Sequence, residues 1–350
     1  MNTSHPNVDA ASKAWSESAT LHVAMPYSNP FRWNARRRLM RDAIQQLNAA
    51  KNVKLYVGEL AYADRPFEVT ADADNQPYRT AQLRTVSELF HKENIVNETI
   101  KVFDPDWQYG AYCDGDFSFT RNDWALEAIH LLQHYDFVQL FSTYTNLSSV
   151  GYGGSQPGKI VRSFVRTYID NGHQLPKGVD PSGHGLAYGY DYATAAPYVG
   201  ATGGAWAFRR SAFDTVGGLL DQAILGSGDW FMAFGLVSEP NAKDKRAMPR
   251  QAARYNPSYV AMVEAWQSRA AMLKRNVGVL DQFVVHHFHG PKSDRGYGTR
   301  DEILIAHQFD PVTDIRRNSH GIYELTGNKP ALRDAIRAYF IARNEDATEI

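Results

Sequence analysis

The sequence has a single cysteine, no long apolar run and almost no net charge, and each absence narrows the possibilities. One cysteine, Cys113, cannot form a disulfide within the chain, so a reducing, cytoplasmic setting is expected. No stretch reaches the length of a membrane span, and the first twenty residues lack the basic and apolar segments of a secretion signal. The net charge of −1 disfavours a protein that only binds nucleic acid.

The rest of the composition is that of a soluble globular protein with many aromatic residues. Of 350 residues, 43% are hydrophobic and 21% are charged, which is enough for one large core or two modest ones. The 19 tyrosines and 7 tryptophans can stack on sugars and bases, although many of them can simply pack inside the protein.

The order of apolar runs predicts an α/β fold with a Rossmann-like, mostly parallel central sheet flanked by helices. Strands are predicted at 21–25, 53–57, 109–113, 137–141, 203–208 and 279–285, and helices at 32–47, 81–102, 122–135, 159–169 and 256–276. Because strands alternate with helices, parallel pairing through right-handed crossovers is expected.

The chain is predicted to form a single large domain with extensions at both ends. Residues 1–18 are small and polar and are expected to form a flexible tail, and the large domain is expected to span 19–300. Within it, residues 142–202 are rich in glycine and tyrosine, which favours a mobile lid or a platform for an acceptor. Residues 301–350 are expected to be a helical C-terminal buttress.

Asp114-Gly115-Asp116 ends the apolar run 109–113 and is the most informative stretch. Two carboxylates at i and i+2 on a strand point the same way, and they repel one another unless a cation or water intervenes. At the carboxyl end of a buried strand, a divalent metal that carries a phosphate meets this requirement. A solvated Asp-Gly turn is the alternative, and these three residues do not decide between the two.

Two later signals are chemically compatible with the aspartate pair. Asp229 follows a Gly-Ser-Gly turn, and three histidines (His286, His287 and His289) follow a predicted strand. Carboxylate oxygens and an imidazole suit Mn²⁺ with positions left open for phosphate oxygens. On a strand, His287 and His289 share one face and His286 lies on the other, so at most two of them meet one site. Alternatively, Asp229 only caps a helix and the histidines are structural.

In their order, these segments resemble GT-A-type glycosyltransferases, and most closely the metal-dependent β-1,4-galactosyltransferase pattern. The similar segments are the helix 90–97 before the Asp-x-Asp turn, the strand 197–208, the turn 213–218, the loop 226–229 and the late histidine His289. The match is discontinuous over about residues 20–300. It departs from the family where Gly-Ser-Gly-Asp replaces a more acidic run, and no methionine stands at the family's second late ligand position.

The resemblance implies a transferase that uses Mn²⁺ or Mg²⁺ and a nucleotide-sugar donor, with a UDP-sugar expected. It implies that Asp116 and His289 bind the metal and that Asp114 binds the metal or the donor ribose; His287, or else His286, is a candidate further ligand. Asp229 is implied to be the general base of an inverting transfer. The residues implied to contact the donor base or phosphates are Tyr27, Asn29, Arg32, Lys92 and Lys292.

The acceptor is left open by the sequence. A cytosolic glycan, a protein, and a hydroxylated DNA base, as in some phage-encoded transferases, are all compatible with it. The DNA hypothesis rests on predicted basic faces at 32–41 and 159–166. Alternatives for the whole protein are a nucleotide-sugar hydrolase with the same fold and a non-catalytic carbohydrate-binding protein.

Overall fold

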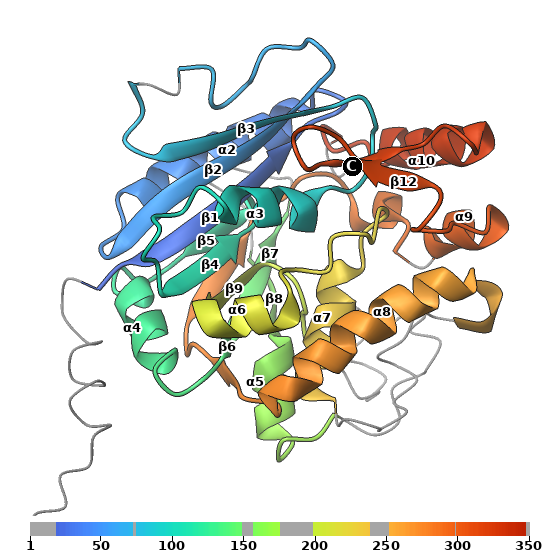
Figure 1. Cartoon of the computed structure of the whole chain (residues 1–350). Coiled ribbons are helices and arrows are strands. Elements are labelled where there is room, and N and C mark those ends of the chain that lie inside the picture. Colours follow the sequence, from blue (N-terminus) through green and yellow to red (C-terminus); the bar gives the residue numbers. More distant parts are fainter. Residues whose placement is uncertain are drawn as a thin grey trace, which may run out of the picture.

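A seven-stranded sheet runs through the centre of the chain in the computed structural model (Figure 1). The structure describes residues 19–72, 75–148, 157–175, 199–238, 252–297 and 299–347, apart from the side chains of 157–159 and 292. The strands of this sheet are β1 (Leu21–Ser28), β2 (Val53–Tyr62), β3 (Arg79–Thr85), β4 (Tyr109–Cys113), β6 (Phe137–Gln139), β9 (Ala205–Arg209) and β10 (Val277–Val279). Their order is β10-β6-β9-β4-β1-β2-β3, and every pair is parallel except those that β9 makes with β4 and β6. The predicted mostly parallel α/β architecture is confirmed.

Helices cover both faces of this sheet because its strands are apolar on both sides. On β1, Val23 and Met25 belong to one buried cluster, whereas Ala24 between them belongs to another. The first cluster includes α2 (Asn34–Asn48) and α4 (Trp124–Leu131). The second includes α3 (Lys92–Ile100), α6 (Arg210–Val216), α7 (Gly228–Val237) and α8 (Pro257–Ala270), which lie in front of the sheet in Figure 1. This two-sided burial is typical of parallel sheets.

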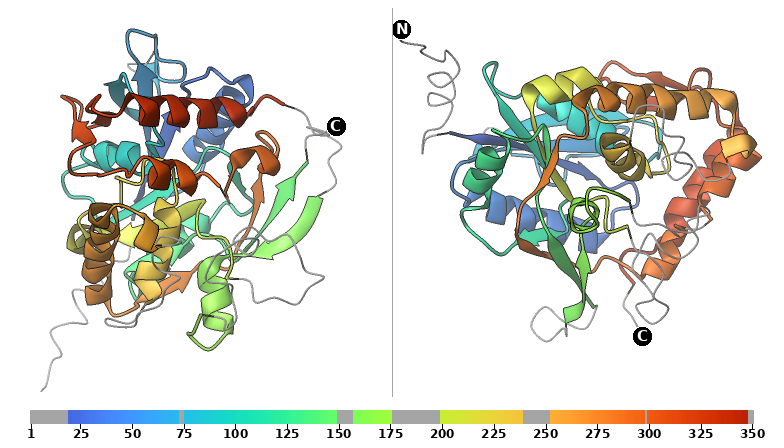
Figure 2. Two further views of the ribbon diagram at one scale, coloured as in Figure 1. Left: turned by 90° about the vertical axis from the view of Figure 1, so that its right-hand side faces the viewer. Right: turned by 90° about the horizontal axis from the view of Figure 1, so that it is seen from below.

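A second sheet of four strands stands beside the first (Figure 2). Its strands are β5 (Phe117–Phe119), β7 (Thr143–Leu147), β8 (Pro157–Arg162) and β11 (Phe283–His286), in the order β5-β11-β7-β8. The chain passes from the first sheet to the second through the turn 114–116, between β4 and β5. Because β5 pairs with β11, with Phe117 opposite His286, this turn lies next to the histidines.

The C-terminal part, expected to be helical, also contains a β-hairpin. The elements of this part are α9 (Asp301–Ala306), the hairpin strands β12 (Ile315–Arg317) and β13 (Tyr323–Leu325), and α10 (Pro330–Ala342). Asn94 of α3 joins the hairpin to the body: its Nδ2 donates to the Gly321 carbonyl at 3.1 Å, and its Oδ1 accepts from the Tyr323 amide at 2.8 Å.

Three predicted elements differ from the structure. The helix expected at 81–102 is β3 followed by the shorter α3, because Ala81, Leu83 and Thr85 alternate inward as strand β3 pairs with β2. The helix expected at 159–169 is the end of β8 followed by α5 (Phe164–Asp170), and the strand expected at 279–285 is divided between β10 and β11. The predicted tail, 1–18, and the parts of the predicted lid at 149–156 and 176–198 lie outside the described residues. Among the described helices, none has both the length and the apolar character needed to cross a membrane.

Candidate functional site

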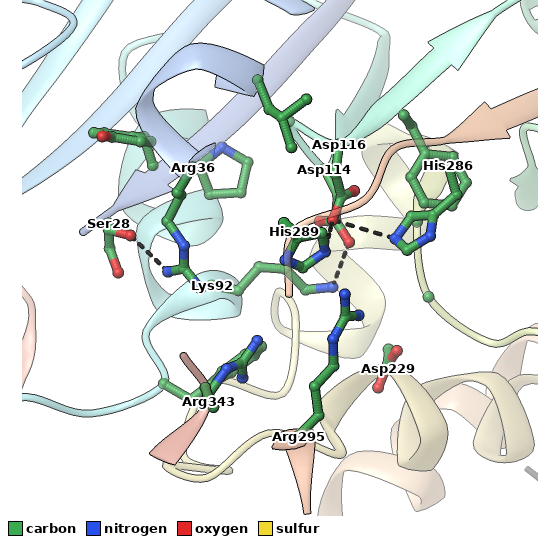
Figure 3. A pocket seen from close by; sticks show the side chains of 18 of the residues that line it. Ser28, Arg36, Lys92, Asp114, Asp116, Asp229, His286, His289, Arg295 and Arg343 are labelled. Atoms are coloured by element: carbon green, nitrogen blue, oxygen red, sulfur yellow. Dashed lines mark hydrogen bonds and ion pairs between the residues drawn. The ribbon is translucent and has the colours of Figure 1, made fainter. Parts of the chain in front are cut away.

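A pocket of about 270 Å³ opens beyond the carboxyl ends of β1 and β4, where the two sheets meet. Crevices at this edge of an α/β sheet are the usual place for ligands. Segments from the whole length of the chain line it (Figure 3). The polar residues of the lining include Ser28, Arg36, Lys92, Asp114, Asp116, Asp229, His286, His289, Arg295 and Arg343.

Asp116, His286 and His289 form a cluster with the composition of a metal site. Asp116 Oδ2 lies 2.7 Å from His289 Nε2 and 3.4 Å from His286 Nε2, and one ligand atom from each residue lies within 4.8 Å of the others. Asp116 Oδ1 and His289 Nε2 are nevertheless buried without a hydrogen bond to any described residue. The His289 Nε2 atom thus lies close to the Asp116 carboxylate without the geometry of a hydrogen bond. Ligands of a divalent ion with bonds of roughly 2.1 Å are spaced in this way, about 3 Å apart.

The orientation of His286 also suits metal binding. Its Nδ1 lies 2.8 Å from the side-chain oxygen of Asn146 on β7. Because an amide oxygen only accepts hydrogen bonds, this contact places the proton on Nδ1 and leaves the lone pair of Nε2 facing Asp116. Ligating histidines commonly have such a partner on the nitrogen that does not bind the metal.

The protonation states of Asp116 and His286 are those that metal ligands require. Burial by itself would raise the pKa of Asp116, but the neighbouring His286 and His289 outweigh it and hold that pKa well below its ordinary range. Burial lowers the pKa of His286 to about 4, against the opposing attraction of Asp116. An ionised carboxylate and a neutral imidazole are the forms that bind a metal ion.

Asp114 faces a different partner from Asp116, because both lie in a turn and not on a strand. Lys92, the first residue of α3, donates from Nζ to Asp114 Oδ2 at 3.1 Å, and Asp114 is not part of the three-residue cluster. Burial raises the pKa of Asp114 to about 6, although Lys92 opposes this. Burial also lowers the pKa of Lys92, but Asp114, Glu93 and Asp229 together raise it well above its ordinary value. Lys92 therefore remains a cation at the edge of the cluster.

A buried guanidinium lines the same pocket as Lys92. Arg295 is only 5% exposed, and its Nη1 donates to the Tyr297 hydroxyl at 3.1 Å. Its Nε is buried and makes no hydrogen bond within the described part of the chain. Figure 3 shows the Arg295 guanidinium pointing toward the Lys92 amine, close to the cluster. Two cations and a candidate metal site in one pocket suit an anion with several oxygens, such as a diphosphate.

Asp229 enters the same pocket from the first turn of α7. The loop before it turns sharply through Gly226 and Ser227, whose φ angles are +92° and 72°. Asp229 Oδ1 accepts from the Trp230 amide at 2.9 Å. The other oxygen, Oδ2, lies over Gly203, where a Cβ would come within 2.4 Å of it. Glycine at position 203 therefore leaves room for the carboxylate.

Only some of the residues predicted to contact the donor line the pocket. Tyr27 lines the pocket, and its hydroxyl donates to Glu68. Asn29 bonds the backbone of Trp33 at the start of α2 and does not line the pocket, and Arg32 is exposed outside it. The side chain of Lys292 lies outside the described residues.

His286, and not His287, joins His289 in the cluster. His287 Nε2 lies 2.7 Å from the Ser118 hydroxyl instead. The predicted alternation of faces does not extend to His289 because β11 ends at His286. Sequence reasoning also left out Arg36 and Arg343, which line the pocket. Arg36 lies in a run of arginines that offered no means of choosing among them, and nothing near Arg343 in the sequence indicated a site.

No protein-family model matches the sequence, and a search of curated proteins found no match. Similar solved structures include a mannosyltransferase from Pyrobaculum calidifontis in complex with GDP-Man and Mn²⁺, with 10% identity and a TM-score of 0.39 over 95% of this chain and 76% of that one. A Drosophila β1,4-galactosyltransferase 7 variant in complex with manganese, UDP-Gal and xylobiose has 12% identity and a TM-score of 0.29 over 61% and 59%. A 4-diphosphocytidyl-2C-methyl-D-erythritol synthase from Anaerococcus prevotii has 10% identity and a TM-score of 0.33 over 76% and 90%. The similar structures thus include glycosyltransferases, as the sequence resemblance predicted, but at these TM-scores they assign no activity or residue role to this chain.

Proposed function

We propose that this protein is a metal-dependent glycosyltransferase that moves a sugar from a nucleoside diphosphate to an acceptor hydroxyl. The observation that supports it best is the composition of one pocket. The carboxylate–imidazole cluster of Asp116, His286 and His289 lies beside the cations Lys92 and Arg295. A further carboxylate, Asp229, lines the same pocket.

Each group has a distinct role in this proposal. Asp116, His286 and His289 hold the ion, for which Mn²⁺ is the first candidate, and a bound ion neutralises the charge of the departing diphosphate. Lys92 and Arg295 bind phosphate oxygens, and Tyr27 lies near the nucleoside. Asp229 accepts the proton of the acceptor hydroxyl, which makes a single inverting displacement the expected course. A UDP-sugar remains the first donor to test.

The described basic side chains lend little support to a DNA acceptor. Arg162 and Arg166 both pair with Asp170, at 3.2 Å and 2.9 Å, and Arg36 is bound to Glu345 within the site. These contacts engage three of the arginines on which the DNA hypothesis rests, and the identity of the acceptor stays open.

Binding of the metal and donor can be tested by thermal shift with UDP-, GDP- and TDP-sugars, each with and without Mn²⁺. A ligand at 100 times its Kd stabilises the native state by about 2.7 kcal/mol, so the correct donor gives a clear shift. Two histidine variants provide a matched pair. His289→Gln should abolish the Mn²⁺-dependent shift, whereas His287→Gln, outside the cluster, should keep it. If no nucleotide sugar shifts the wild-type melting temperature, the proposed function is wrong.

Transfer can be separated from hydrolysis by following the sugar of the bound donor. Asp229→Asn should bind the donor as the wild type does and lose roughly 10²- to 10⁴-fold in the rate of transfer, the usual contribution of a general base. Release of the sugar to water at the same rate with and without any acceptor would indicate a hydrolase instead.

A further inference from the structure

The last described residues of the chain return to the metal cluster. Glu345 lies beyond the end of α10, and its side chain is fully buried. Two guanidinium groups surround its carboxylate. Arg36 of α2 donates from Nε at 2.8 Å and from Nη2 at 2.6 Å, and Arg343 donates from Nε at 2.9 Å. A buried carboxylate with this many charge-assisted bonds is held in one place.

The Glu345 carboxylate lies on the Nδ1 side of the His289 ring, away from the metal cluster. Glu345 Oε2 lies 3.6 Å from His289 Nδ1, while Nε2 of the same ring faces Asp116 at 2.7 Å. The first distance is too long for a hydrogen bond but within the range of an ion pair. A negative charge on this side favours a proton on Nδ1, whereas Asp116 favours a proton on Nε2. An ion held by Asp116 and His289 would remove that competition, and Glu345 would then favour the tautomer in which Nε2 can act as a ligand.

The backbone of the C-terminal segment also packs against the loop that carries His289. At Gly290, whose φ is +88°, a Cβ would lie 2.8 Å from Glu345 Cα and 3.2 Å from the Arg343 carbonyl oxygen. The two backbones are therefore in direct contact one residue after the histidine. This contact is independent of the side-chain geometry and limits where the ring of His289 can lie.

The same carboxylate is linked to the first strand. Arg36, held by Glu345, donates from Nη1 to the carbonyl of Ser28 at the end of β1, at 2.7 Å. Ser28 and Arg36 both line the pocket. One buried side chain thus connects the C-terminal segment, the His289 loop and the end of β1.

We propose that Glu345 is a positioning residue of the metal centre, which orients His289 for the ion and fixes Arg36 against the end of β1. The inference rests on the metal centre proposed above. It makes Arg343 and Glu345 part of the site and not only a support for the fold.

The full-length chain without donor tests this inference through its affinity for Mn²⁺, measured by titration calorimetry or paramagnetic resonance. Glu345→Gln should weaken Mn²⁺ binding by roughly 10- to 100-fold, as loss of a partner behind a ligating histidine does. Asp346→Asn removes the same charge one residue later. Within the described residues, the side chain of Asp346 accepts hydrogen bonds at the start of α2, from the amides of Asn34 (2.9 Å) and Ala35 (2.7 Å) and from the Asn34 side chain (3.4 Å). This variant should therefore bind Mn²⁺ as the wild type does.

A second readout works without metal. In metal-free protein with ¹⁵N-labelled histidine, Asp116 favours a proton on His289 Nε2 and Glu345 favours one on Nδ1, so Glu345→Gln should shift the tautomer balance of His289 toward Nε2–H. If Glu345→Gln does not fold, Glu345→Asp retains the charge between Arg36 and Arg343 but withdraws it from His289, and should show the same two changes to a smaller degree. A folded Glu345 variant with wild-type affinity and tautomer overturns the inference. If the wild type itself binds no Mn²⁺, the metal centre is wrong, while the tautomer still tests the role of Glu345.

Discussion

At the scale of single residues, Gly203 controls where the Asp229 carboxylate can lie. A Cβ at position 203 would be 2.4 Å from Asp229 Oδ2, so Gly203→Ala forces the carboxylate to move. If Asp229 is the general base, a displacement of about 1 Å should lower the transfer rate by roughly 100-fold. Melting temperature and Mn²⁺ affinity should stay close to wild type, because neither depends on Asp229.

The control for this prediction is the double variant Gly203→Ala/Asp229→Asn. Two changes that act through the same group are not additive, so the glycine substitution should cost little once Asp229 is already disabled. An equal loss in both backgrounds would mean that Gly203 acts in another way, and an unchanged rate for Gly203→Ala would remove Asp229 from its proposed role.

A buried histidine makes stability depend on pH. Burial lowers the pKa of His91 to about 4, although its hydrogen bond to the Ser87 carbonyl, at 3.1 Å, and the charge of Glu324 oppose this. In the unfolded chain His91 titrates near pH 6.5, so between pH 6.5 and 4 the unfolded state binds a proton that the native state does not. The free energy of unfolding is therefore at its full value above pH 6.5. It falls by about 3 kcal/mol as the pH drops toward 4.

The contribution of His91 can be isolated by difference. Urea unfolding of the wild type and of His91→Gln, followed from pH 7.5 to 4.5 with a chelator present, should give a wild-type free energy of unfolding that falls more steeply with acid. Equal slopes for the two proteins would show that His91 is protonated in the native state or that its environment is not buried.

At the scale of elements, α3 lies so close to β2 that position 58 must be glycine. A Cβ on Gly58 would be 2.0 Å from Thr99 Oγ1 and 2.8 Å from a methyl group of Ile95. Gly58→Ala should therefore push α3 off the sheet and lower the free energy of unfolding by about 1–3 kcal/mol. Denaturant unfolding gives this value directly. The double variant Gly58→Ala/Thr99→Ala removes the closest contact, so it should lose less than the sum of the two single changes.

The same helix shows how local patterns can mislead a prediction from sequence. Apolar residues at 83, 86 and 90 fit one face of a helix, but Val86 is 74% exposed and Leu83 lies in a strand. The pairing of β3 with β2 determines the outcome, and no local pattern reports such a contact between distant segments. By contrast, β1, β4 and β9 are central strands buried on both faces, and their apolar runs indicated them correctly.

At the scale of the whole molecule, the pocket gathers residues from positions 26 to 343, and the sequence identified only part of them. Asp116, Asp229 and His289 follow recognisable turns or strand ends, which is why they could be chosen in advance. Arg36 and Arg343 carry no local signal, because an arginine becomes part of a site only through the tertiary contacts that bury it. The choice between His286 and His287 depended on where β11 ends, and strand boundaries are poorly determined by sequence.

The charges gathered in the pocket also predict that metal and donor bind cooperatively. Without the ion, a diphosphate would face the carboxylates of Asp114, Asp116 and Asp229, and only the basic side chains of the lining would compensate for them. With the ion, part of this repulsion is cancelled. We therefore expect Mn²⁺ to tighten binding of the nucleoside diphosphate by a coupling free energy of about 1–3 kcal/mol.

Because coupling between two binding equilibria is reciprocal, the nucleoside diphosphate must tighten Mn²⁺ binding by the same factor. Calorimetric titrations in both orders measure the two factors, with a nucleoside monophosphate as a control of lower charge. Since Mn²⁺ also binds free diphosphates, the titrations need correction for that equilibrium. Independent binding of the two ligands would place the cation and the phosphates apart, and would contradict an ion that bridges the protein and the leaving group.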